Sequence, residues 1–170
     1  YEKRDGTKLT PSLVLVDSGD QTDMVYNFCA DTSDYTLPSK GASKRLETDY
    51  KFSTINKPGS KAAGMNLVIV DTAKYKDRIA ARMRRQNGTG AWMVFQGIDD
   101  NYAAQVTSEH KINERQANGV PVQKWVLKNS HGANHYLDAE VYAMAAADIR
   151  GARTWHLEKY EPPKKQEKPS

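Results

Sequence analysis

The chain has 170 residues, of which 38% are hydrophobic, and this composition suits one globular domain. No apolar run approaches the roughly 20 residues of a membrane span, and Cys29, the only cysteine, excludes an intrachain disulfide and a cysteine-rich zinc site. The net charge of +4 is a mild indication of nucleic-acid binding, since phosphate contacts come from Lys and Arg.

The first half of the chain predicts strands that end on acidic residues. The apolar run 12–17, SLVLVD, predicts a buried strand that ends on an aspartate. The segment 22–29, TDMVYNFC, contains β-branched and aromatic residues and predicts a second strand. The stretch 31–64 is rich in Ser, Thr, Lys, Gly and Pro and predicts one more strand with long loops. The run 66–70, NLVIV, predicts another buried strand, and a second aspartate follows it.

Helical spacing and turn signals dominate the second half of the chain. Tyr75, Ile79 and Met83 have the i, i+4 spacing of an amphipathic helix. Thr72 is expected to cap this helix, and Asn118-Gly119 is a strong hairpin signal. The expected elements are a helix over 72–85, a strand over 92–95, a helix from 99 or 100 to 108, hairpin strands over 112–115 and 122–127, and a helix over 134–150.

This order of elements predicts an α/β fold of the ribonuclease-H-like type. It would have a mixed sheet flanked by helices and an extra β-hairpin before the last helix. Residues 1–151 are expected to form this domain, and residues 152–170, which are rich in Pro and Lys, a flexible tail. The chain begins with YEKRDGTK rather than a methionine, so we expect a piece of a longer protein.

Three aspartates stand at the ends of predicted elements. Asp17 ends the first strand, Asp71 follows the strand 66–70, and Asp138 lies in the first turn of the last helix. Two divalent ions about 4 Å apart can activate water and stabilise the leaving oxygen in phosphodiester cleavage. Hard ions such as Mg²⁺ prefer carboxylate oxygens. An aspartate at a strand end is also a common turn or cap residue, so each of the three alone is weak evidence.

Four segments stand out over roughly residues 12–151, and they are VDSGDQTDMVYNFC, VIVDTAKYKDRIAARM, QVTSEHK and NHYLDAEVYAMAAADI. In their order and spacing they resemble the C-terminal nuclease domain of the large terminase subunit of lambda-like tailed bacteriophages. The resemblance implies a ribonuclease-H-like endonuclease that uses two divalent cations, Mg²⁺ or Mn²⁺, to cut concatemeric viral DNA in the host cell cytoplasm. It also implies partners, namely double-stranded DNA, the ATPase motor domain of the same large subunit, the small terminase subunit and the portal, and no membrane.

The resemblance also implies roles for individual residues. The implied catalytic metal ligands are Asp17, Asp71 and Asp138. Asp23 fits an accessory acid that related nucleases carry after the first one, and Asp20 fits it less well. Where lambda-like members commonly have Asn-Glu before the last acid, this chain has His135, which lies one helical turn from Asp138 and is an accessory candidate for binding metal or phosphate. Lys74 is the basic residue nearest to the proposed site.

Basic residues of two predicted elements are expected to contact DNA. They lie on the helix after Asp71 and on the hairpin, and they are Lys74, Arg78, Arg82, Arg85, Lys111, Arg115, Lys124 and Lys128. A solvated helix face explains the first group equally well, and packing against the motor is an alternative for the second. Glu109, in QVTSEHK, is expected to anchor the hairpin rather than to take part in catalysis.

Other functions stay open at this level. Met65 and Asn66 follow the spaced glycines Gly59 and Gly64 where a P-loop has Lys and Ser or Thr, so no ATP site is visible. A junction-resolving or transposase-like nuclease of the same fold is one alternative. The other is a non-catalytic DNA or protein docking module whose acids cap turns.

Overall fold

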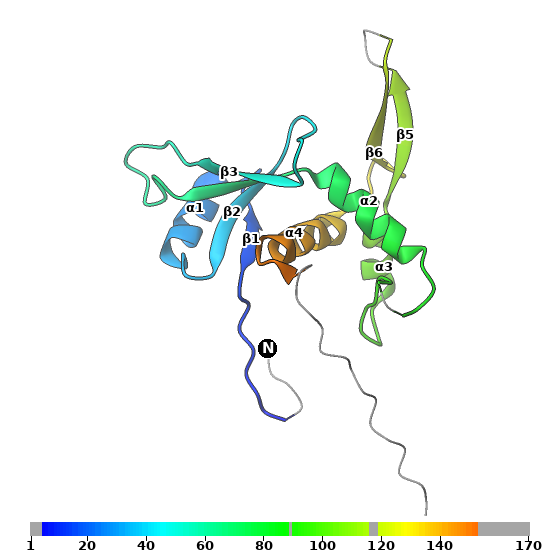
Figure 1. The fold of residues 1–170 in the computed structure, drawn as a ribbon, viewed down its shortest axis with the longest axis horizontal. Helices are drawn as coiled ribbons and strands as arrows, with labels where there is room; N and C mark the ends of the chain where they lie inside the picture. Colours follow the sequence, from blue (N-terminus) through cyan, green and yellow to red (C-terminus); the bar gives the residue numbers. More distant parts are fainter. Residues whose placement is uncertain (1–4, 89, 116–118, 153–170) are drawn as a thin grey trace, which may run out of the picture.

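The computed structural model describes residues 5–88, 90–115 and 119–152, and these fold into a mixture of strands and helices (Figure 1). The elements are β1 (Val14–Asp17), α1 (Thr22–Asp31), β2 (Thr36–Gly41), β3 (Tyr50–Thr54), β4 (Asn66–Val70), α2 (Thr72–Met83), α3 (Asp100–Val106), β5 (Glu109–Arg115), β6 (Pro121–Leu127) and α4 (His135–Ile149). The predicted α/β class is confirmed.

Four strands form one mixed sheet in the order β1-β2-β4-β3. Strands β1, β2 and β4 are parallel, and β3 is antiparallel to β4. The carboxyl ends of the three parallel strands therefore meet at one edge of the sheet, the edge at which ligands bind in open α/β sheets. Asp17 ends β1 at this edge, Gly41 ends β2, and Asp71 follows β4.

The segment 22–29, which was predicted to be a strand, is the helix α1, so that prediction was wrong. The two strands on either side of it, β1 and β2, are parallel neighbours, and parallel strands need a crossover connection, which α1 supplies. Tyr26 and Cys29 are its buried residues. Their spacing of three belongs to one face of a helix, although the residue types favour a strand.

Three smaller predictions also need correction. The stretch 31–64 contains two strands, β2 and β3, rather than one. Residues 92–95 form no strand, and Met93 and Phe95 are exposed there. Asp71, rather than Thr72, caps α2, because the Asp71 carboxylate accepts a hydrogen bond from the backbone N–H of Lys74.

The later elements agree with the sequence. Asp99 caps α3, the two hairpin strands pair as β5 and β6, and α4 covers the predicted last helix. Gly119 has a φ of 80°, the left-handed conformation that glycine favours in a hairpin turn, while Asn118 lies outside the described residues. The hairpin extends away from the sheet beside α2 (Figure 1), and Asp77 of α2 anchors it by accepting a hydrogen bond from Trp125 Nε1 at 3.0 Å.

The main hydrophobic core joins the sheet to α2 and α4. Val68 and Val70 of β4, Ile79 of α2 and Val141 of α4 are all buried in it. A smaller cluster includes Tyr26 of α1. The core therefore fixes α4 against the sheet, and this packing decides where the acid of the last helix lies relative to the strand ends.

Three predictions about organisation are not tested by these elements. The ribonuclease-H-like topology and the domain boundary at residue 151 stay predictions. The flexible tail was predicted over 152–170, and residues 153–170 of it lie outside the described residues. None of the helices in the described ranges has the length and apolar character to cross a bilayer.

Candidate active site

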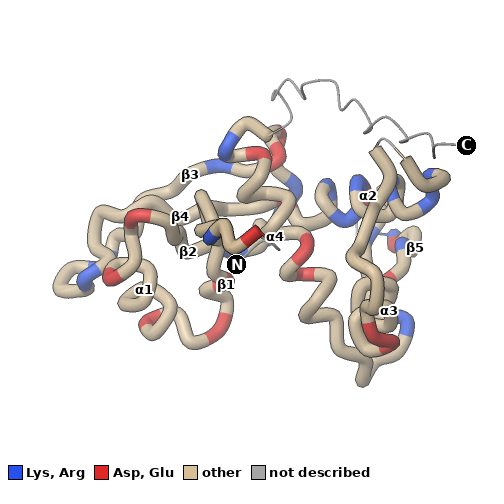
Figure 2. The backbone as a smooth tube through the Cα atoms, turned by 90° about the horizontal axis from the view of Figure 1, so that it is seen from below, with Lys and Arg blue, Asp and Glu red and all other residues tan. Residues whose placement is uncertain are grey.

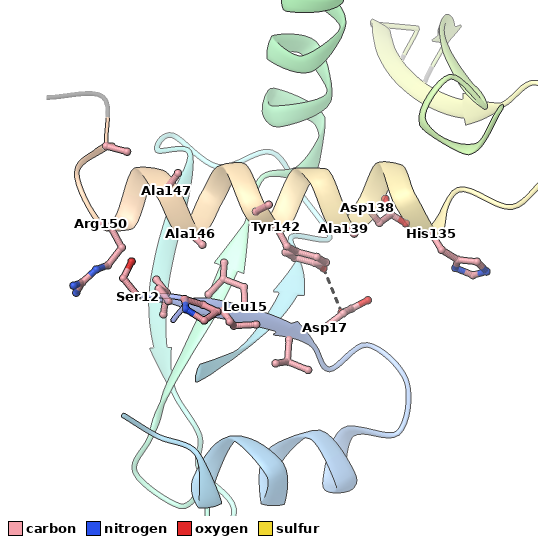
Figure 3. A pocket seen from close by; sticks show the side chains of 16 residues that line it. Ser12, Leu15, Asp17, His135, Asp138, Ala139, Tyr142, Ala146, Ala147 and Arg150 are labelled. Carbon is pink, nitrogen blue, oxygen red and sulfur yellow. Dashed lines mark hydrogen bonds between the residues drawn. The ribbon is translucent and has the colours of Figure 1, made fainter. Parts of the chain in front are cut away.

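A pocket of about 900 Å³ lies between β1 and α4 (Figure 3). Its polar lining includes Asp17 from the end of β1 and His135, Asp138 and Tyr142 from the first half of α4, and Arg150 lines the other end. Because residues three and four apart share a helix face, the α4 residues form one wall. We call this the Asp17–Asp138 pocket.

Asp17 is exposed and is held by two hydrogen bonds to its Oδ1 atom. The backbone N–H of Gly19 donates at 3.0 Å, and the hydroxyl of Tyr142 donates at 3.3 Å. Figure 3 shows Tyr142 extending from α4 to Asp17. A Cβ atom at position 19 would lie only 3.3 Å from Asp17 Oδ1, so glycine lets the turn approach the carboxylate closely. The carboxylate thus has a defined orientation in the pocket.

Tyr142 donates a hydrogen bond to Asp17 and also senses the negative charge of Asp138. Burial is the main cause that raises the pKa of its hydroxyl, and the negative charge and hydrogen bond of Asp17 and the charge of Asp138 raise it further. A hydrogen bond with the backbone of Gly41 acts in the opposite direction. The hydroxyl therefore stays protonated at neutral pH and can donate to Asp17.

Asp138 is held in position by Lys76, which belongs to a buried polar network with Glu109 and Asn134. Lys76 Nζ of α2 lies 3.1 Å from Asp138 Oδ1 and 2.7 Å from Glu109 Oε1. Asn134 Nδ2 donates to the same Glu109 oxygen at 2.7 Å. The Lys76 and Glu109 side chains are only 10% and 5% exposed, against 39% for Asp138. Glu109 therefore ties the hairpin to the start of α4, in agreement with its expected anchoring position.

Asp71 has a different environment from the other two acids. It is 3% exposed, its Oδ1 accepts from the backbone N–H of Lys74 at 3.2 Å, and its Oδ2 accepts from that of Leu46 at 3.0 Å. It does not line the Asp17–Asp138 pocket. Its carboxylate is occupied by backbone donors at the start of α2.

The strand register explains why Asp71 lies apart from Asp17. Asp17 pairs with Ser39, and Ser39 pairs with Val68 on the next strand. Asp71 is three positions beyond Val68, which corresponds to roughly 10 Å along the strand direction, in addition to two strand spacings across the sheet. Both residues stand at the same edge of the sheet, but Asp71 lies further along the strand direction than Asp17.

Of the three accessory candidates, only His135 lines the Asp17–Asp138 pocket. His135 lines the pocket one helical turn before Asp138. Asp23 is exposed on α1, forms an ion pair with Lys57 and does not line the pocket. The Lys74 ammonium group donates to three backbone carbonyls, those of residues 46, 47 and 48, at 2.8, 2.8 and 3.0 Å.

The predicted DNA-binding residues fall into a paired and an unpaired set. Arg78 pairs with Asp49, Lys111 with Asp77, and Lys124 with Glu114. Of the remaining predicted residues, Arg82, Arg85, Arg115 and Lys128 are exposed and form no ion pair within the described part of the chain. Figure 2 shows Lys and Arg gathered along α2. A second pocket, of about 600 Å³, is lined by Lys111 and Lys128 where the hairpin meets α2.

The pocket suits a cation site made of two carboxylates and does not suit a preformed site made of three acids. Within the described ranges, no group of three or more His, Cys, Asp or Glu side chains is placed to hold a metal ion. Asp17 and Asp138 nevertheless line one pocket, and Mg²⁺ is commonly held by one or two carboxylates with water and substrate phosphates completing its shell. The donor set therefore fits a divalent cation at Asp17 and Asp138, and does not fit a preformed cage that includes Asp71.

Sequence reasoning missed two residues of this site. Tyr142 lies four residues after Asp138, so helical spacing could have placed it on the same face. Lys76 had no such signal, because its partners Glu109 and Asp138 are far away in the sequence.

The comparisons with known proteins give one match. A family model described as the endonuclease domain of the terminase large subunit gpA matches residues 1–158. No curated protein and no solved structure matches the chain.

Proposed function

The chain belongs to the family of terminase large subunit gpA endonuclease domains, and on this basis we propose that Asp17 and Asp138 form its DNA-cleaving site. As a phage terminase nuclease, it would cut concatemeric viral DNA in the host cell, with site choice supplied by the small subunit and the motor. The observation that carries the proposal is that acids from β1 and α4 line one pocket, in which Tyr142 of α4 donates a hydrogen bond to Asp17 of β1.

The two carboxylates would hold one divalent cation, Mg²⁺ or Mn²⁺, together with water and a phosphate of the DNA. When bound, such a cation supplies charge stabilisation at the phosphate and lowers the pKa of a bound water. Only one cation is proposed for the protein without DNA, because the carboxylate of Asp71, the third predicted ligand, is occupied by backbone N–H groups.

The protein's own residues would orient this site. The Tyr142 hydroxyl holds Asp17 Oδ1, and Lys76 holds Asp138 Oδ1, so each carboxylate keeps one oxygen for a ligand. His135, on the same face of α4 as Asp138, would contact the phosphate that enters the pocket. Ordering both acids before DNA binds reduces the entropy lost in forming the cleavage complex.

Plasmid cleavage tests the proposal. Supercoiled plasmid is incubated with Mn²⁺, with Mg²⁺ or with EDTA, and nicking is followed over time. We expect cleavage only with metal. Asp17→Asn and Asp138→Asn should each lower its rate at least about 100-fold, which corresponds to about 2.7 kcal/mol of lost transition-state stabilisation. Asp34→Asn, at an exposed turn position outside the pocket, is the matched control and should cut normally.

Mn²⁺ binding measured by calorimetry gives a second readout. Asp17→Asn and Asp138→Asn should weaken it, and Asp34→Asn should not. Unchanged cleavage in Asp17→Asn would rule out the proposed site. DNA binding by the wild type without cleavage in any metal would instead favour the docking-module alternative.

A further inference from the structure

The connection between β2 and β3, residues 42–49, is held against the start of α2 by a dense set of hydrogen bonds. We call it the 42–49 loop, and Figure 1 shows it beside the first turn of α2. At its first residue, the Ala42 N–H donates to the carbonyl of Val70 at 2.8 Å. At its last residue, the Asp49 carbonyl accepts from the Asp71 N–H at 2.9 Å, and its carboxylate pairs with Arg78 at 2.6 Å.

Two side chains of the sequence-predicted site fix the middle of this loop. Asp71 accepts from the Leu46 N–H, and the Lys74 ammonium group donates to the carbonyls of residues 46, 47 and 48. An ammonium group has three donors, and all three are used here. Both charged groups therefore act on the backbone of the loop, and the donors of the Lys74 ammonium group are already used by its carbonyls.

The held loop presents two exposed basic side chains. Lys44 and Arg45 lie between the anchor at Ala42 and the anchor at Leu46, and both are exposed. Neither forms an ion pair or a side-chain hydrogen bond with another residue in the described ranges. Because the backbone on both sides is already fixed, these side chains lose less entropy on binding an anion than they would on a mobile loop.

The loop starts next to the Asp17–Asp138 pocket. The backbone of Gly41, which precedes it, lies close enough to the Tyr142 hydroxyl to lower the pKa of that group, and the same hydroxyl donates to Asp17. Strand β2 also lies between β1 and β4, so the loop leaves the same sheet edge at which Asp17 stands. A DNA strand that entered the pocket would therefore pass close to Lys44 and Arg45.

We propose that the 42–49 loop is a phosphate-binding loop, in which Lys44 and Arg45 contact the DNA backbone and Asp71 and Lys74 hold the loop in position. This rests on the proposed function for its ligand, double-stranded DNA. Lys74 is then a positioning residue instead of a direct phosphate contact, and Asp71 acts in the same way.

Salt-dependent DNA binding tests the loop. A fluorescein-labelled 30-base-pair duplex is titrated in EDTA, so that no cleavage occurs, between 50 and 250 mM KCl. Each phosphate contact contributes about −0.9 to the slope of log K against log salt concentration. The double variant Lys44→Ala/Arg45→Ala should therefore weaken binding and reduce the slope by about 2. The matched control Lys57→Ala/Lys61→Ala removes the same charge from residues paired with Asp23 and Asp31, and should change the slope by less than about 1.

Lys74→Met separates the positioning role from a direct contact. If Lys74 acts through the loop, this change weakens binding in the wild type but adds no further loss to Lys44→Ala/Arg45→Ala. If Lys74 contacts phosphate itself, the losses add and the slope falls by about 1 more, which overturns the positioning role.

Failure of the loop and failure of the proposed function give different results. An unchanged slope in Lys44→Ala/Arg45→Ala, with wild-type plasmid nicking intact, overturns the loop and leaves the nuclease standing. No DNA binding and no nicking by the wild type overturns both. The test with Lys44→Ala/Arg45→Ala changes only exposed residues, so it stays valid even if Lys74→Met does not fold. Thermal unfolding followed by circular dichroism checks that each variant is folded.

Discussion

The ammonium group of Lys76 lies between two carboxylates, and the side chains of Lys76 and Glu109 are almost fully buried. Glu109 is its nearer partner, at 2.7 Å, and Asp138 lies at 3.1 Å. The second oxygen of Glu109, Oε2, is buried without a hydrogen-bond partner among the described residues. A buried carboxylate is stable only while its counter-charge stays in place, so removing one partner costs far more than breaking an exposed pair. At the scale of single residues, Lys76 therefore decides whether Glu109 and Asp138 keep their positions.

Lys76→Met is expected to lower the free energy of unfolding by about 3 kcal/mol, because it leaves the Glu109 charge buried and unpaired. Urea denaturation measures this. Lys57→Met is the matched control, since Lys57 and its partner Asp23 are 47% and 69% exposed, and it should cost less than about 1 kcal/mol. Adding Glu109→Gln to Lys76→Met should recover part of the loss. The interpretation is wrong if Lys76→Met costs no more than the control.

At the scale of elements, the first turn of α2 combines helix capping with loop anchoring. Asp71 caps the helix through one carboxylate oxygen and holds Leu46 of the 42–49 loop through the other. The acid that looks catalytic from its place after β4 therefore has structural partners on both sides. Its neighbour in the helix, Lys74, holds the same loop.

Asp71→Ala is expected to destabilise the protein by about 2 kcal/mol, since it removes a cap and leaves a second backbone N–H without its acceptor. Asp99→Ala removes only a cap, that of the short helix α3, and should cost about 1 kcal/mol or less. Urea denaturation of both variants gives the difference. Equal losses would mean that the bond to Leu46 contributes nothing.

At the scale of the whole molecule, three tyrosines from different parts of the fold make the folded protein more stable at neutral than at alkaline pH. Burial is the main cause that raises the pKa of Tyr75, Tyr102 and Tyr142 above the ordinary value of about 10. Carboxylates add to the effect: Asp148 at Tyr75, Glu140 at Tyr102 and Asp17 at Tyr142. The folded protein keeps these protons to a higher pH than the unfolded chain does.

The stability that depends on these protons is therefore complete below about pH 10 and falls as the pH rises further, because the unfolded chain then releases protons that the folded protein retains. We expect the urea midpoint of the wild type to drop between pH 9 and pH 11. Tyr142→Phe should make that drop less steep, since it removes one of the retained protons. An identical pH dependence in Tyr142→Phe would contradict the buried, Asp17-bonded state of this hydroxyl.

Local patterns in the sequence were enough to predict much of the fold. The apolar runs before Asp17 and Asp71 predicted β1 and β4, and helical spacing of apolar residues predicted α2 and α4, because each depends on residues a few positions apart. The same locality explains the main error. Residue types favoured a strand at 22–29, but the parallel pairing of β1 with β2 requires a crossover there, and the helix is the result of that long-range pairing.

The sequence by itself determined the family of this protein, as the matching family model confirms, and it placed Asp17 and Asp138 at the ends of β1 and α4. Only the tertiary structure decided which acids share a pocket. The strand register carries Asp71 beyond Asp17, and packing of α4 on the sheet brings Tyr142 to Asp17 and Asp138 to Lys76. These contacts join residues separated by tens to more than a hundred positions, and no periodicity along the chain records them, because distance in space is set by the packed core rather than by neighbours in sequence.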